Sequence, residues 1–87
     1  MVGQLPPGAQ RVIELGGGTG AFTRALLDRG IAPRNLLVIE LNEALHRLLG
    51  ERFPSVQVEC GDARDVQQIA RRSGVLDQDG HVDAVVS

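Results

Sequence analysis

The sequence predicts an α/β fold, a doubly wound parallel sheet with its strands in the order 3-2-1-4. Three observations predict it. Short apolar runs suited to strands alternate along the 87 residues with segments of helical apolar spacing. A glycine-dense turn, Gly16-Gly-Gly-Thr-Gly20, directly follows the first run. Strands that alternate with helices form right-handed β-α-β units, and such units build parallel sheets.

The composition bounds the chain to one globular domain at most. The residues are 43% hydrophobic, an ordinary fraction for a folded protein, and the formal net charge is -2. That charge gives no bulk attraction to nucleic acid or anionic lipid, and two Phe without Tyr or Trp argue against a base-stacking surface. The single cysteine, Cys60, excludes an internal disulfide and is expected to be buried in a strand. The sequence has no metal-ligand spacing, membrane-length apolar run or signal peptide, so a cytoplasmic setting is expected.

Residues 1–10 are expected to form a loop that leads into a first strand at residues 11–15, whose apolar run is too short for a helix. A helix follows the glycine turn, with Thr19 expected as its cap. Its apolar face is expected to comprise Ala21, Phe22, Ala25 and Leu26. It should end near residues 28–30, because Gly30 suits the position after a helix.

The second strand, residues 36–40, has four consecutive apolar residues. This predicts burial on both faces, in the middle of a parallel sheet. Asn42 is expected to cap the next helix and Pro54 to end it, with His46 on the polar face. The apolar stripe of this helix is expected to comprise Leu41, Leu45, Leu48 and Leu49.

The third strand, residues 56–60, alternates between apolar and polar side chains, which places it at the edge of the sheet. Asp62 or Asp65 is expected to begin a third helix. The inward residues of that helix are predicted to be Val66, Ile69 and Ala70. Residues 73–81 are predicted to form a polar loop.

The fourth strand, residues 82–87, is apolar at Ala84, Val85 and Val86, which predicts a buried strand. In the order 3-2-1-4, however, its far edge has no neighbour, and folded proteins normally cover such an apolar edge. We therefore expect one of two arrangements. Residues 11–87 are the N-terminal, cofactor-binding half of a larger domain, truncated after this strand, or a partner such as a second copy covers the edge.

The glycine turn predicts a nucleotide or nucleoside cofactor. Its backbone lets a ligand approach closely, and the start of the following helix favours negative charge. The spacing Gly16-x-Gly18-x-x-Ala21, with Glu40 about 20 residues further on, fits the Rossmann dinucleotide fingerprint. From this spacing alone, NAD is one candidate.

Three details favour S-adenosylmethionine over NAD. Glu14, two residues before the first glycine, would repel a diphosphate and attract an ammonium or sulfonium group. Gly20 supplies a third glycine that dinucleotide folds do not need. Asp62, in a tight turn after the third strand, can accept a hydrogen bond from the adenine amine.

Four segments resemble the motifs of the class I S-adenosylmethionine-dependent methyltransferases, in that family's order and spacing. They are Glu14-Leu-Gly-Gly-Gly-Thr-Gly20, Leu37-Val-Ile-Glu40, Glu59-Cys-Gly-Asp-Ala63 and Asp83-Ala-Val-Val-Ser87. The resemblance covers nearly the whole chain from residue 11. It implies a Rossmann-like fold, methyl transfer as the activity and S-adenosylmethionine as the cofactor.

The resemblance implies a cofactor-binding role for each matching residue. Gly16, Gly18 and Gly20 would border the methionine part of the cofactor, and Glu14 would orient its charged end. Gly17 belongs to the same turn but departs from the family's commoner Pro or Ala, which is expected to loosen the turn.

The ribose and adenine would be bound by the later motifs. Glu40 would bind both ribose hydroxyls, with Leu41 beside it, and Asp62 with the Ala63 backbone would recognise adenine. The alternative for Glu40 and Asp62 is that they are only helix N-terminal charges, stabilised by the helix dipole.

A finer resemblance comes from residues 18–27, 52–54 and 83–87, which look similar to bacterial phospholipid N-methyltransferases and the related rRNA adenine dimethylases. It implies a phospholipid amine as the favoured methyl acceptor and an RNA adenine as the second choice. In both groups the acceptor-binding motif follows the fourth strand, so this chain alone is expected to be inactive. Two other functions stay open: an NAD-binding oxidoreductase fragment, and a non-catalytic binding or dimerisation module.

Overall fold

The computed structural model describes residues 8–76 and 80–86. Its strands are β1 (Val12–Leu15), β2 (Leu36–Glu40), β3 (Gln57–Cys60) and β4 (Ala84–Val86). Its helices are α1 (Ala21–Asp28), α2 (Glu43–Arg52) and α3 (Val66–Ser73), with 3₁₀ turns η2 (Pro33–Asn35) and η3 (Ala63–Asp65). Parts of the predicted N-terminal loop (residues 1–7), polar loop (77–79) and fourth strand (87) lie outside the described residues.

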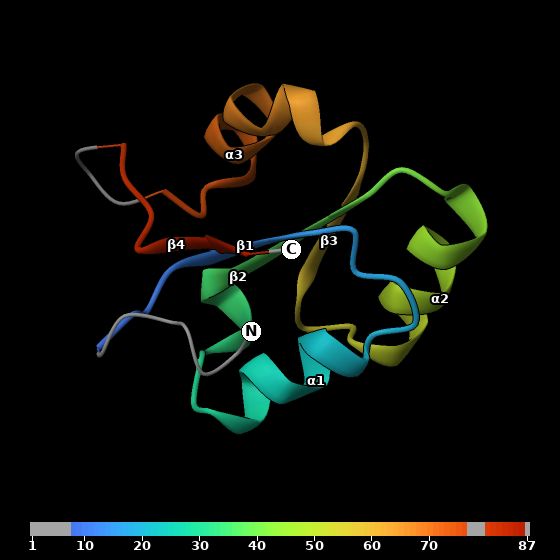
Figure 1. The fold of residues 1–87 in the computed structure, drawn as a ribbon, viewed down its shortest axis with the longest axis horizontal. Coiled ribbons are helices and arrows are strands. Elements are labelled where there is room, and N and C mark those ends of the chain that lie inside the picture. The colour runs from blue at the N-terminus through green and yellow to red at the C-terminus, as the bar shows by residue number, and fades with distance from the viewer. Residues whose placement is uncertain (1–7, 77–79, 87) are drawn as a thin grey trace.

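The four strands form one parallel sheet in the order β3-β2-β1-β4, which confirms the predicted α/β fold (Figure 1). β1 pairs with β2 from Val12 opposite Leu36 and with β4 from Val12 opposite Ala84. Asp83 holds the start of β4 beside β1, because its Oδ2 accepts hydrogen bonds from the backbone N–H groups of Gln10 (2.7 Å) and Arg11 (2.8 Å). Because all the strands are parallel, their four carboxyl ends lie together at one end of the sheet.

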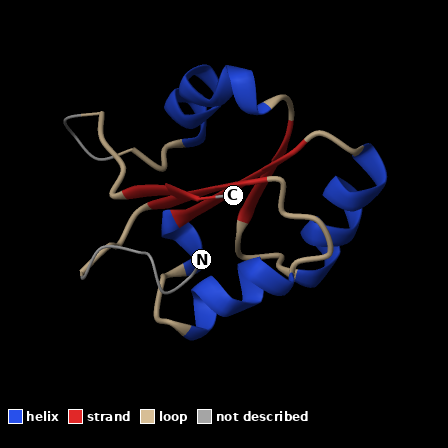
Figure 2. Cartoon of the chain, in the orientation of Figure 1, coloured by secondary structure: helices blue, strands red, loops and turns tan. Residues whose placement is uncertain are grey.

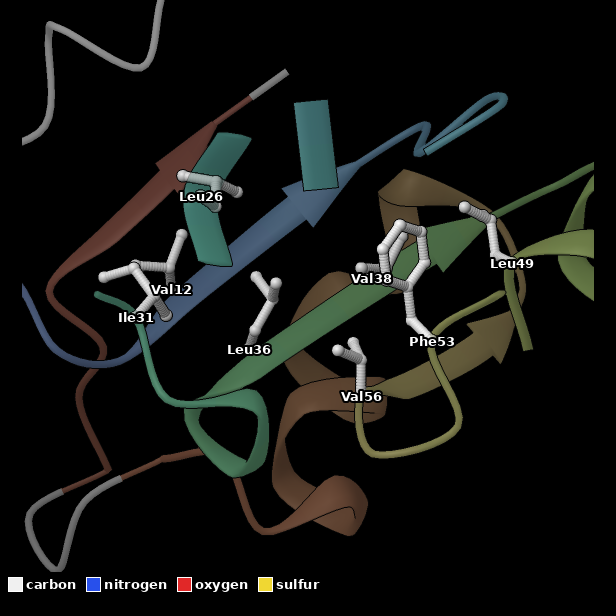
Figure 3. Close-up of a cluster of buried hydrophobic side chains, with 8 residues drawn as sticks. All are labelled: Val12, Leu26, Ile31, Leu36, Val38, Leu49, Phe53 and Val56. Atoms are coloured by element: carbon white, nitrogen blue, oxygen red, sulfur yellow. The ribbon is translucent and has the colours of Figure 1, made fainter. Parts of the chain in front are cut away.

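Helices cover the sheet on both faces, with α1 and α2 on one side and α3 on the other (Figures 1 and 2). Two hydrophobic clusters fill the space between the layers. The cluster on the α1 and α2 face comprises Val12, Leu26, Ile31, Leu36, Val38, Leu49, Phe53 and Val56 (Figure 3). The cluster on the α3 face comprises Ile13, Leu37, Ile39, Ile69, Ala70 and Val75. Every residue of β2 is buried, as its uninterrupted apolar run predicted.

The helix after the glycine turn differs from the prediction at its start. α1 begins at Ala21, and its N-cap is Gly20, with φ +94° and no side-chain capping bond. Thr19 is therefore not the cap, because the turn ends in a left-handed residue that glycine adopts without steric cost. Ala21, predicted to face the core, is exposed, while Thr23 is fully buried.

Predictions around α2 and β3 are partly confirmed. Asn42 caps α2, its Oδ1 accepting the Leu45 N–H at 3.0 Å. Leu41 is wrong as a stripe residue: it precedes the cap and is 66% exposed. His46 is half-buried, with Nε2 3.0 Å from the Val58 carbonyl oxygen, because α2 lies close against the edge strand. Cys60 is exposed, not buried, since it ends that edge strand.

Of the two predicted aspartates, Asp65 is the one at the start of α3, as its N-cap residue without a side-chain capping bond. Asp62 caps the 3₁₀ turn η3, accepting the Arg64 N–H at 2.8 Å, and α3 follows from Val66. Ile69 and Ala70 are buried as predicted. The loop after α3 is less polar than expected, because Val75 packs into the α3-side cluster.

β4 differs most from its sequence pattern. Its apolar run predicted burial, but Val85 is 51% exposed. β4 pairs with β1 along one edge, and no strand among the described residues pairs with the other. A hollow of about 350 Å³ lies between α3 and β4, with Ile13, Val66, Ala70 and Val82 in its wall. The predicted unpaired apolar edge of β4 is therefore present in this structure.

Gly17 packs the glycine turn onto the core. A Cβ at Gly17 would lie 2.5 Å from Val38 Cγ1 and 2.9 Å from Leu49 Cδ1. Its φ is not positive, so the requirement for glycine comes from packing and not from backbone conformation. The absence of a side chain lets the turn lie tightly on β2 and α2, contrary to the expectation that Gly17 loosens it.

We predict that Gly17→Ala lowers the free energy of unfolding by about 1–3 kcal/mol, the cost of overpacking a filled core. Val38→Ala, added to Gly17→Ala, should recover part of the loss by removing the overlapping methyl group. Gly50→Ala is the matched control, because Gly50 lies in α2 and a Cβ there would have no neighbour within 4 Å. That control should gain up to about 1 kcal/mol. Urea unfolding measures all three, and a Gly17→Ala variant as stable as wild type would contradict the packing argument.

Candidate functional site

The predicted site residues lie at or directly after the carboxyl ends of three neighbouring strands, β1, β2 and β3. The Gly16 N–H donates to the Ile39 carbonyl oxygen at 2.7 Å, so the glycine turn starts as a continuation of the β1–β2 ladder. The Gly61 N–H donates to the Glu40 carbonyl oxygen at 3.1 Å, which ties the turn after β3 to the end of β2. In open parallel sheets, ligands bind in the crevice beyond these strand ends.

The glycine turn uses left-handed backbone at every second residue. Gly16, Gly18 and Gly20 have φ values of +71°, +58° and +94°, which residues with a Cβ rarely adopt. Two bonds close the turn: the Gly20 N–H donates to the Gly17 carbonyl at 3.0 Å, and Arg52 Nη1 donates to the Thr19 carbonyl at 2.9 Å. The alternating glycines in the sequence therefore match a backbone that needs them.

Glu40 joins the glycine turn to the start of α2. Its side chain is 7% exposed, its Oε1 accepts the Gly18 N–H and its Oε2 accepts the Asn42 N–H, each at 2.9 Å. Each carboxylate oxygen has a second lone pair that can accept another hydrogen bond. Glu40 is thus held in place by the backbone and retains the capacity to bind a diol.

Glu14 is buried beneath the turn, with 2% of its surface exposed. Thr23 Oγ1 donates to its Oε1 at 2.6 Å. Burial raises the pKa of Glu14 above the usual value for a glutamate, the Thr23 hydrogen bond opposes that rise, and the nearby Glu40 charge adds to it. Glu14 is therefore not a solvated charge at the end of a strand, and a cationic ligand would offset the cost of burying it.

Asp62, predicted to recognise adenine, is bonded to Arg64. Besides accepting the Arg64 N–H, it accepts Arg64 Nε (3.2 Å) and Nη2 (3.0 Å) at Oδ2. These bonds lower the pKa of Asp62. The Arg64 side chain is 88% exposed, so the ion pair is weak and can be displaced. Ala63 begins the 3₁₀ turn and is exposed.

The structure gathers the predicted residues unevenly. Glu40 bonds to the glycine turn directly, and Glu14 bonds to Thr23 in the helix after that turn. The turn that contains Asp62 is joined to Glu40 by the Gly61 N–H. Leu41, which directly follows Glu40, is exposed. Sequence reasoning missed Thr23, although a hydroxyl residue between Phe22 and Leu26 on an inward helix face was a signal, since a buried hydroxyl needs a partner.

Among residues 8–76 and 80–86, no three His, Cys, Asp or Glu side chains gather as a metal ion would require. Within the same part of the chain, no helix has both the length and the apolar character to cross a membrane. The bonds described above show a candidate site of backbone N–H groups and carboxylates. Such a site fits a nucleoside that carries hydroxyl groups and positive charge.

Comparison with known proteins gives one informative match. The chain is 38% identical over 74 residues to an ornithine lipid N-methyltransferase of Singulisphaera acidiphila. The match covers 82% of this chain but 38% of the relative, so the chain spans well under half of the relative's length. No family model and no solved structure matches the chain. The similarity supports a methyltransferase family.

The raised pKa of Glu14 predicts a pH-dependent stability difference. The folded chain holds the Glu14 proton more tightly than the unfolded chain does, whose pKa is near 4.5. Its contribution to stability is therefore greatest below pH 4.5 and is lost as pH rises through the folded pKa. Wild type should lose stability relative to Glu14→Gln over that interval, because the glutamine does not titrate.

Urea unfolding of both proteins between about pH 4 and 8 measures this difference. The pKa values of Asp62 and Asp83 are lowered, so their contributions to the stability of the fold increase as pH rises. Both residues are present in wild type and in the variant, so these contributions cancel in the difference. A difference that stays constant across the range would mean that Glu14 is not penalised by burial.

Proposed function

We propose that the chain binds S-adenosylmethionine at the glycine turn and forms the cofactor-binding part of a methyltransferase. The observation that carries this proposal is the buried Glu40 carboxylate, bonded to Gly18 N–H on one side and Asn42 N–H on the other. Glu40 is the last residue of β2, at the end of the strand where a nucleoside ribose would lie over the glycine turn. The similarity to a methyltransferase supports the same cofactor.

The charge around the turn favours a cation over a diphosphate. Glu14 and Glu40 are both buried on the α1 and α2 side of β1 and β2, and each carries negative charge when ionised. A diphosphate over the turn would be repelled by Glu14, whereas a sulfonium or ammonium group would be attracted, and Glu40 in either case is placed to bind a ribose. An NAD-binding oxidoreductase is therefore not favoured, and the similarity to a methyltransferase disfavours a non-catalytic module.

In this proposal the chain's own residues bind and orient the methyl donor. S-adenosylmethionine supplies an already activated methyl group, so alignment and exclusion of water are the protein's main tasks. Gly16, Gly18 and Gly20 border the methionine part, Glu40 binds the ribose, and Asp62 and Ala63 recognise adenine. Gly17 shapes the turn and Leu41 covers the ribose side. None of these residues acts as a general base.

We propose an amine of a membrane lipid headgroup as the methyl acceptor. The matched relative is named for an ornithine lipid, and the phospholipid N-methyltransferase resemblance indicates the same class of acceptor. An RNA adenine is less favoured, because a net charge of -2 gives no general attraction to phosphate backbones.

Glu40→Gln should weaken S-adenosylmethionine binding by about tenfold or more, since an amide has one acceptor oxygen for two backbone donors and lacks the charge that strengthens the ribose contact. Glu51→Gln is the matched control, because Glu51 is exposed on α2. Isothermal calorimetry with both S-adenosylmethionine and NAD gives the affinities. A folded wild-type chain that binds NAD, or neither ligand, would refute the proposal.

We also propose that a second copy of the chain covers the free edge of β4. The half-exposed Val85 and the unpaired strand edge support this arrangement. Sedimentation equilibrium should show a concentration-dependent dimer, and Val85→Lys should shift it to monomer by placing a charge on the edge. A wild-type chain that stays monomeric at all concentrations would exclude the dimer.

A further inference from the structure

A buried hydroxyl–carboxylate pair connects β1 to α1 beneath the glycine turn. Thr23 is fully buried, Glu14 is 2% exposed, and 2.6 Å separates Thr23 Oγ1 from Glu14 Oε1. That length is typical of a hydroxyl that donates to an ionised carboxylate. A threonine at this position of an amphipathic helix would otherwise be a poor substitute for an apolar core residue.

The local backbone leaves the Thr23 hydroxyl available for this bond. In helices, threonine commonly donates to the carbonyl four residues earlier, which here is Thr19. The Thr19 carbonyl instead accepts Arg52 Nη1 at 2.9 Å, and α1 begins only at Ala21. Arg52, at the end of α2, thus donates to the glycine turn. The Thr23 hydroxyl donates instead to Glu14 of β1.

We propose that Thr23 is a positioning residue that fixes the Glu14 carboxylate and keeps it ionised, so that Glu14 can act as the counter-charge for the cofactor's cationic end. This inference rests on the proposed function. Thr23 does not touch the cofactor in this scheme. It acts through Glu14, and its hydroxyl replaces the hydration that Glu14 loses on burial.

The charges around Glu14 make this donor necessary. In the sheet, Glu14 lies opposite Val38 of β2 and Val86 of β4, and neither side chain can hydrogen-bond. Burial disfavours the ionised form of Glu14, and the negative charge of Glu40, also in β2, disfavours it further. From α1, Thr23 provides the opposing contribution. Removing its hydroxyl should therefore raise the pKa of Glu14 further.

The test compares Thr23→Val, which keeps the shape without the hydroxyl, with Thr23→Ser, which keeps the hydroxyl. Thr23→Val should weaken S-adenosylmethionine binding by about tenfold or more, as expected for the loss of one hydrogen bond to a charged group. As the pH is lowered, the Thr23→Val variant should also lose its affinity for S-adenosylmethionine at a higher pH than wild type does. Thr23→Ser should restore both. Thr23→Ala replaces Thr23→Val if the latter does not fold.

A second measurement does not depend on the cofactor. Carbon-13 NMR titration of the Glu14 carboxyl in the ligand-free chain, assigned with Glu14→Gln, should show a higher pKa in Thr23→Val and an unchanged one in Thr23→Ser. An unchanged titration in Thr23→Val would overturn the inference, as would equal effects of valine and serine. If wild type fails to bind S-adenosylmethionine, the proposed function is wrong, and the titration still decides the role of Thr23.

Discussion

The Glu40 carboxylate is the interaction on which the site depends. Its two oxygens accept N–H groups from the turn after β1 and from the start of α2, so one side chain fixes two loops relative to each other. Bonds from charged groups to backbone donors are among the stronger hydrogen bonds in proteins. The two loops are consequently held in place by Glu40 without a ligand, which would reduce the ordering cost of binding.

Two buried carboxylates on one face of a small sheet work against stability. Burial disfavours the ionised form of Glu14, and the Glu40 charge increases the penalty. A core built only for stability would place apolar residues there, as it does at neighbouring Val12 and Val38. Buried ionisable groups with shifted pKa values are typical of functional sites, where they lower local stability but provide charge for binding a ligand. A cationic ligand would relieve the penalty, so binding and stability should be coupled.

The sequence was sufficient for features set by periodicity and local capping. The strand order, the edge position of β3, the burial of β2 and the Asn42 cap all follow from spacing. Features set by contacts between different elements were not predicted. Thr23 bonds to a strand nine residues away, the exposure of Cys60 depends on where the edge strand ends, and Gly17 matters because Val38 and Leu49 fill the space above it. The ligand-binding roles of the site residues remain predictions.

A crystal of the folded chain soaked with equal concentrations of S-adenosylmethionine and NAD tests the central claim most directly. We expect density for S-adenosylmethionine, with its ribose hydroxyls on Glu40 and its methionine part along Gly16 to Gly20. A diphosphate lying across those glycines, with the Glu14 carboxylate still bonded only to Thr23, would contradict the account.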